Sequence, residues 1–216
     1  MARPPRHNRG RDFQRRAPQR PVYERLLIVC EGTKTEPHYL DAIRRANRVP
    51  TAHITILPSD LGTQPRQVVD FAVQKFVETR AYEKVFAVFD RDEHATYNDA
   101  LKRARQLDGT LRNDDRRPVE FRAIASVPCF ELWLLLHFED VHAFGQRAEM
   151  IAKLKKHIPD YEKGATNIYA LTEQRIDEAK GRAAQLKGRF TADDGTDPYT
   201  DIHDLVDLLR AIRAQP

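Results

Sequence analysis

The chain has 216 residues, of which 41% are hydrophobic and 31% are charged. This composition is typical of a soluble globular protein, and the length allows one main domain with an appendage but excludes two large domains. The first apolar run, Leu26–Cys30, is only five residues long, and no later run could span a membrane. We therefore expect neither a signal peptide nor a membrane partner.

The positive charge is concentrated at the N-terminus. Seven of the 36 basic residues and one of the 32 acidic residues lie in the first 20 positions, which leaves 29 basic and 31 acidic residues, a net charge of −2, for the rest. Residues 1–22 have almost no apolar side chains to bury and are predicted to be a disordered basic arm. Such an arm either contacts nucleic-acid phosphates or is only a solubilising tail.

The two cysteines, Cys30 and Cys129, lie far apart in apolar segments. They have neither the spacing of a metal site nor that of a disulfide framework, so they are predicted to be buried thiols. This usage indicates a reducing compartment, and we expect the cytoplasm.

Strands and helices alternate along the first part of the chain. Short runs rich in β-branched and aromatic residues predict strands over 25–30, 52–57, 84–89 and 119–125. Apolar periodicity predicts helices over 37–48, 65–79, 97–107 and 129–138. We expect Thr35 and Thr63 to cap the first two helices. The apolar face predicted for the second helix consists of Val68, Val69, Ala72, Val73, Phe76 and Val77.

Four alternations of strand and helix predict a right-handed α/β core with a parallel sheet flanked by helices, over residues 23–140. Residues 141–216 are predicted to form a mainly helical C-terminal region, with helices over 144–157, 172–189 and 203–213 and a loop over 191–201.

Acidic residues follow two of the predicted strands. Glu31 comes directly after the first strand, and Asp90 and Asp92 come after the third. Open α/β sheets bind ligands at the carboxyl ends of their strands, so these three acids are expected to meet there. Three clustered carboxylates repel one another without a cation, and Mg²⁺ or Mn²⁺ takes such oxygen ligands together with substrate phosphates. The sequence therefore predicts a metal site, although acids at single turns are also common N-caps.

Four basic residues are candidates for phosphate or nucleic-acid binding. Lys34 lies in the first turn and Arg91 lies between the two aspartates, while Lys153 and Lys156 belong to a basic stretch in the C-terminal region. A solvated helix face is the alternative for the last two. His94 either assists proton transfer or is a surface residue.

The acid-bearing segments resemble a known fold and family. A Glu-Gly turn after the first strand and Asp-x-Asp after the third resemble the Toprim fold of topoisomerases, bacterial primases and OLD-family nucleases. The segments Leu27–Glu36, Val88–His94, Ser126–Phe138 and Asp197–Thr200 are similar to the RloB family of Toprim-like prokaryotic defence proteins. The chain departs from the usual Ser-Asn-Pro of the family by having Val127 in the middle position.

This resemblance implies a nuclease-type site and a role in phage defence by abortive infection. It implies that Glu31 is a metal-linked general acid or base and that Asp90 and Asp92 are metal ligands. Glu36 and Glu131 become candidate accessory acids, although either could simply compensate the dipole at the start of a helix. Some family members act beside an ATPase partner, and a homo-oligomer is also compatible.

We therefore expect a Mg²⁺-dependent endonuclease that hydrolyses RNA, with tRNA among the candidates, or DNA. The alternative is a non-catalytic nucleic-acid-binding or regulatory partner of a defence ATPase, in which the acids hold a structural ion. A third interpretation makes Asp90 a phosphatase-type nucleophile, but that class places its Asp-x-Asp after the first strand. The spacing of Thr33–Thr35 does not match a nucleotide-binding loop, so ATP binding by this chain is not expected.

Overall fold

The computed structural model describes residues 24–143, 145–195 and 197–212. The predicted basic arm, residues 1–22, lies outside this range. None of the helices in the described residues is both long and apolar enough to cross a membrane.

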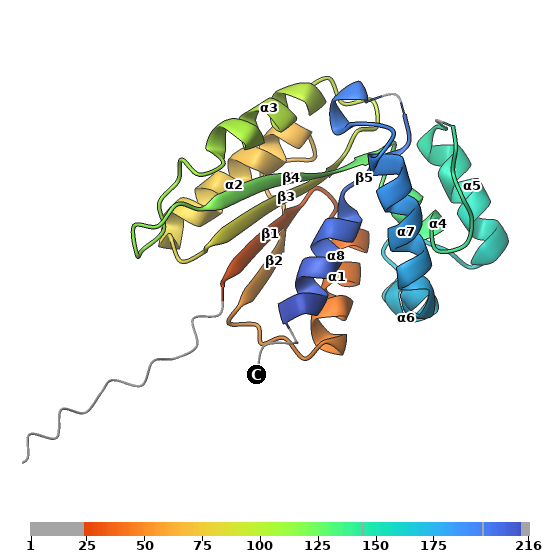
Figure 1. The fold of residues 1–216 in the computed structure, drawn as a ribbon, viewed down its shortest axis with the longest axis horizontal. Helices are drawn as coiled ribbons and strands as arrows, with labels where there is room; N and C mark the ends of the chain where they lie inside the picture. The colour runs from red at the N-terminus through yellow and green to blue at the C-terminus, as the bar shows by residue number, and fades with distance from the viewer. Residues whose placement is uncertain (1–23, 144, 196, 213–216) are drawn as a thin grey trace, which may run out of the picture.

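A five-stranded sheet in the order β2-β1-β3-β4-β5 forms the centre of the molecule (Figure 1). The first four strands are parallel, and β5 runs antiparallel to β4. The strands are β1 (Leu26–Cys30), β2 (Ile54–Pro58), β3 (Lys84–Asp90), β4 (Glu120–Val127) and β5 (Tyr199–Thr200). The protein thus has the predicted Toprim-like α/β fold with a helical C-terminal part.

Helices cover both faces of the sheet, which explains why β1 is apolar throughout and β3 is apolar from Val85 to Phe89. On one face lie α2 (Pro65–Thr79) and α3 (Tyr97–Leu107), and on the other lie α1 (Thr35–Ala46) and α8 (Ile202–Ala211). The side chains of β1 alternate between these layers: Leu26 and Ile28 pack with α1 and α8, and Leu27 packs with α2 and α3.

The remaining helices gather beside α1 and α8, near the carboxyl ends of the strands (Figure 1). They are α4 (Glu131–Leu135), α5 (Arg147–His157), α6 (Ile168–Thr172) and α7 (Ile176–Lys187), with 3₁₀ turns at Glu173–Arg175 and Ala192–Asp194. The buried apolar residues of α4 to α7 belong to the same core cluster as α1 and α8, whereas Ala192 belongs to the cluster on the α2 and α3 side. Both cysteines are buried and free, as expected.

Several local expectations are wrong. Thr35 is the first residue of α1 and does not cap it, and its hydroxyl instead accepts a hydrogen bond from the Gly164 N–H (2.9 Å). Thr63 does not cap α2, because the N-cap is Gln64, whose N–H donates to Gln67 Oε1 (3.2 Å). Val77 is 50% exposed, and Phe71 takes a place on the buried face of α2.

The C-terminal elements also differ from the prediction. The segment predicted as one helix over 172–189 is divided by the 3₁₀ turn before α7, and the helix over 129–138 is regular only within α4. The segment 191–201, predicted as a loop, contains β5. A two-residue strand carries no periodic pattern, so its pairing partner alone defines it.

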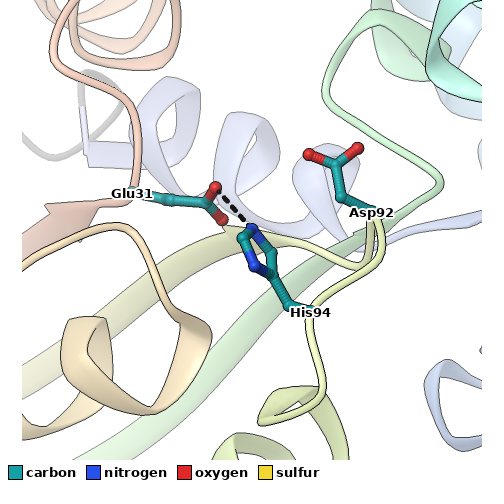
Figure 2. A group of neighbouring side chains, drawn as sticks. All are labelled: Glu31, Asp92 and His94. Carbon is teal, nitrogen blue, oxygen red and sulfur yellow. Dashed lines mark hydrogen bonds and ion pairs between the residues drawn. The ribbon is translucent and has the colours of Figure 1, made fainter.

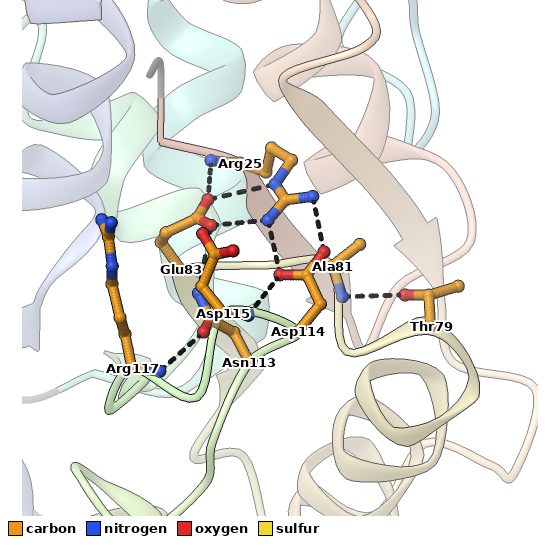
Figure 3. A network of polar contacts seen from close by, with 8 residues as sticks. All are labelled: Arg25, Thr79, Ala81, Glu83, Asn113, Asp114, Asp115 and Arg117. Carbon is orange, nitrogen blue, oxygen red and sulfur yellow. Dashed lines mark hydrogen bonds and ion pairs between the residues drawn. The ribbon is translucent and has the colours of Figure 1, made fainter.

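A network at the amino ends of the strands fixes β1 and β3 relative to each other (Figure 3). The Arg25 guanidinium donates to Glu83 Oε1 (2.7 Å) just before β3 and to Asp114 Oδ1 (2.9 Å) in the loop before β4. The Arg25 N–H also donates to Glu83 Oε2 (2.5 Å), and the Asn113 amide donates to Glu83 Oε1 (3.2 Å). These contacts support the register of the two strands whose other ends carry the predicted acids.

Candidate metal centre

Glu31 is held at the carboxyl end of β1 by β3. Its N–H donates to the Val88 carbonyl (2.8 Å), and its Oε2 accepts from the Asp90 N–H (2.9 Å). The residue is only 8% exposed. Burial raises the pKa of Glu31, while the Asp90 N–H and His94 act in the opposite direction.

Asp90 ends β3, and the chain then turns sharply. Asp92 has φ +36°, in the left-handed region, and its N–H donates to the Pro128 carbonyl (2.9 Å). The segment from Asp90 to Asp92 is therefore a turn and not a continuation of the extended strand. Arg91 holds the turn, since its guanidinium donates to the carbonyls of Asp92 (3.1 Å) and His94 (3.2 Å) and lies over the Tyr97 ring.

This turn brings a histidine into the acidic group. Glu31, Asp92 and His94 each offer one ligand atom, and these atoms all lie within 4.8 Å of one another. His94 Nε2 lies 3.2 Å from Glu31 Oε1, and Figure 2 shows that Asp92 and His94 come from the same turn. Two carboxylates and an imidazole are a donor set that binds divalent transition metals, and the carboxylates also suit Mg²⁺. This group could hold a divalent metal ion.

Arg147, the first residue of α5, bridges the two aspartates. Its Nη2 lies 2.5 Å from Asp90 Oδ2 and 2.6 Å from Asp92 Oδ2. Burial and the neighbouring Glu36 and Glu31 raise the pKa of Asp90, whereas Arg147 opposes that change. Asp90 is thus a buried acid with a guanidinium partner, and its role as a metal ligand stays a prediction.

The two predicted accessory acids are buried close enough to Asp90 for their charges to act on it. Glu36 is 9% exposed and Glu131 only 1% exposed. Burial raises the pKa of Glu36, and the charges of Glu131 and Glu31 add to that effect. Glu131 Oε1 accepts a hydrogen bond from the Tyr161 hydroxyl (3.0 Å), while its Oε2 has no hydrogen-bond partner among the described residues. The structure therefore brings all five predicted acids to one end of the sheet.

A cavity of about 370 Å³ is lined by four of these acids, all except Glu131. The loop after β1, including Lys34, forms one part of its wall, and Arg147 and Lys163 from the C-terminal region form another. The other predicted cations lie elsewhere: Arg91 is engaged in its own turn, and Lys153 and Lys156, on later turns of α5, do not line this cavity.

Arg147 and Lys163 were not predicted from the sequence. The sequence did contain one signal for Arg147. A positive charge in the first turn of a helix interacts unfavourably with the helix dipole, so an arginine at that position indicates a compensating contact with acidic groups. The acids at the end of the sheet supply that contact. Lys163 gave no such signal, since only the folded chain brings its loop to the site.

Two segments on which the family resemblance rests meet in the structure. Ser126 and Thr200 are partners in the β4–β5 pairing, and their hydroxyl oxygens lie 3.1 Å apart. The peptide bond between Val127 and Pro128 is cis. The Pro128 carbonyl accepts a hydrogen bond from the Asp92 N–H. The segment around Pro128 therefore helps to shape the turn that carries Asp92 and His94.

Fold and site together define a Toprim-like α/β protein with a candidate metal centre at the carboxyl edge of its sheet. A family model described as RloB-like protein matches residues 26–209. The chain belongs to the RloB-like family. No curated protein matches it, and no solved structure does.

Proposed function

We propose that this protein is a metal-dependent nuclease that hydrolyses phosphodiester bonds of RNA or DNA in defence against phage. The observation that supports this most is the convergence of Glu31, Asp92 and His94 on one point beneath a cavity with cationic walls. Membership of the RloB-like family agrees with a defence role. The nitrogen ligand of His94 favours Mn²⁺ over Mg²⁺ as the most effective ion.

Each residue of the candidate metal centre would have its own role in phosphodiester hydrolysis. A divalent cation, when bound, neutralises charge on the phosphoryl group and lowers the pKa of water. Asp92 and Glu31 would hold it through carboxylate oxygens and His94 through Nε2. His94 Nε2 lies 3.2 Å from Glu31 Oε1, so a bound ion would contact both residues, and the Glu31 carboxylate would accept the proton of a water beside that ion.

The test is cleavage of labelled substrates by the full chain. Single-stranded RNA, tRNA, and single- and double-stranded DNA are each incubated with Mn²⁺, with Mg²⁺ and with EDTA. We expect cleavage that requires the metal, and a loss of roughly a hundredfold or more in rate in Asp92→Asn and Glu31→Gln. Asp115→Asn, which neutralises an exposed carboxylate at the opposite end of the sheet, is the matched control and should retain full activity.

One observation favours the alternative of a non-catalytic partner of a defence ATPase. Arg147 already pairs with Asp90 and Asp92, as a purely structural ion pair would. In that case no substrate is cut under any metal condition, while the chain still binds nucleic acid or a partner ATPase. The same assay, combined with a pull-down of the ATPase, distinguishes the two functions.

A further inference from the structure

The loop between α5 and α6 is attached firmly to the edge of the candidate metal centre. The Gly164 N–H donates to Thr35 Oγ1 (2.9 Å), and the Gly164 carbonyl lies 3.2 Å from His38 Nδ1. The Tyr161 hydroxyl donates to the buried Glu131 carboxylate. Three contacts thus join this loop to α1 and α4, and they hold Lys163, which lies between Tyr161 and Gly164, in the wall of the cavity.

Lys34 and this loop are in close contact. Gly164 has φ +89°, and a Cβ added there would lie 2.8 Å from Lys34 Cδ and 2.9 Å from Lys34 Cβ. Only glycine allows the loop to approach the stem of Lys34 this closely. The stem of Lys34 is therefore packed against the backbone that carries Lys163, and both lysines line the same cavity.

Neither lysine takes part in an ion pair among the described residues, whereas Arg147 on the same wall pairs with Asp90 and Asp92. The charge of Lys163 acts on the acids below, since it opposes the rise in the pKa of Asp92 that burial causes. The two lysines have no carboxylate partner among the described residues and lie beside the acidic residues of the candidate metal centre. They suit a ligand that has one group bound to the metal ion and a second, negatively charged group.

We propose that Lys34 and Lys163 together bind a backbone phosphate of the nucleic acid, next to the phosphodiester that lies over the acids. This inference rests on the proposed function, which supplies the substrate class. The hydroxyls of Thr33 and Thr63, which also line the cavity, are additional donors to that phosphate. The C-terminal region thereby takes part in substrate binding through Lys163.

The test is binding of a fluorescein-labelled, 5′-phosphorylated eight-nucleotide oligonucleotide, as RNA and as DNA, by the full chain in EDTA. Lys163→Ala and Lys34→Ala should each weaken binding about five- to tenfold and reduce the slope of log affinity against log salt by about 0.7. Lys163→Arg should retain most of the affinity. The double variant should lose less than the product of the single losses, because both lysines bind one phosphate.

Lys102→Ala is the matched control, since it removes the same charge from an exposed position on α3 outside the cavity and should stay within twofold of the wild type. The N-terminal arm is present in every variant and contributes equally to each. Mn²⁺ affinity, measured by electron paramagnetic resonance, should not fall in Lys163→Ala. That result distinguishes loss of a phosphate contact from damage to the metal centre.

The outcomes separate this inference from the nuclease proposal. Unchanged affinity and salt slope in Lys163→Ala, with cleavage intact, would overturn the lysine site and leave the nuclease standing. Binding that depends on Lys163 without cleavage under any metal condition would support the lysine site and reject the nuclease. Equal losses in Lys163→Ala and the Lys102→Ala control would show a general charge effect and overturn the specific site.

Discussion

At the scale of single residues, Arg147 controls the charge balance of the acidic centre. It pairs with Asp90, which is 4% exposed, so Arg147→Met leaves a buried carboxylate without its partner. We expect a loss of about 3 kcal/mol in the free energy of unfolding in EDTA. Mn²⁺ should restore more stability to the variant than it adds to the wild type, because no guanidinium then competes for Asp92.

Urea unfolding with and without Mn²⁺ measures both effects. The matched control is Arg105→Met, whose pair with Asp193 is exposed on both sides and should contribute at most about 1 kcal/mol. Equal losses in the two variants, or an identical effect of Mn²⁺ on Arg147→Met and the wild type, would contradict this account of the centre.

His137 makes the fold sensitive to acid at a point away from the metal centre. It is fully buried, its ring lies 4.8 Å from that of Trp133, and burial lowers its pKa to about 4. The unfolded chain, with a histidine pKa near 6.5, binds the proton more readily than the fold does. The contribution of neutral His137 to the free energy of unfolding is therefore complete above about pH 6.5 and is lost as the pH falls toward 4.

The expected size of this effect at pH 4.5 is about 2 to 3 kcal/mol. His137→Gln should reduce the difference in unfolding free energy between pH 7 and pH 4.5 by that amount, measured by urea unfolding at both values. Exposed His142→Gln serves as the control. If His137→Gln kept the full wild-type difference, the buried neutral histidine would not be its source.

The site residues divide into those that sequence could predict and those it could not. Glu31, Asp90 and Asp92 follow apolar strands, and the topology of a parallel sheet alone brings such positions together. Arg147 and Lys163 reach the site only through the packing of α5 and the loop after it. His94 depends on the left-handed turn at Asp92, which no sequence period describes.

At the scale of elements, the Arg25 network should affect stability without affecting the site. Burial acts to raise the pKa of Glu83, but the hydrogen bonds and charge of Arg25 outweigh it and the pKa is lowered. Because it joins the starts of β1 and β3, Glu83→Ala should lose about 1 to 2 kcal/mol. Mn²⁺ affinity should stay within twofold, since the metal centre lies at the opposite ends of these strands.

Urea unfolding and a Mn²⁺ titration of the same preparations test this prediction. Glu120→Ala, which removes a more exposed carboxylate paired with Lys84 at the start of β4, should lose less than about 1 kcal/mol. A large fall in metal affinity in Glu83→Ala would show instead that a change at the amino ends of β1 and β3 displaces Glu31 at the carboxyl end of β1.

Elements with strong periodicity matched their predictions, and those defined by distant contacts did not. The helices predicted over 65–79 and 97–107 agree with α2 and α3 at both ends, because each has a continuous apolar face that packs on the sheet. In contrast, β5 exists only because Tyr199 and Thr200 pair with β4. Local sequence does not encode such a partner.

At the scale of the whole molecule, residues 23–140 and 141–216, which the sequence predicts to be separate regions, share one buried cluster. The buried cluster on the α1 side of the sheet contains Leu26 of β1, Trp133 of α4 and Leu205 of α8, together with apolar residues of α5 and α7. The C-terminal region also supplies β5 to the sheet and Arg147 to the acids. The boundary at residue 140 stays a prediction, and this packing indicates one cooperative unit.

Unfolding of the full chain in urea should therefore be a single transition. Trp133, the one tryptophan in the sequence, is fully buried in the shared cluster, so its fluorescence reports the contact between the two parts. Far-UV circular dichroism reports the helices of both. The two curves should coincide, and Arg147→Met should shift them together, because removing a contact between parts of one unit lowers the stability of all of it. An early fluorescence change that leaves most of the helical signal intact would show that residues 141–216 detach first, and would establish two folding units.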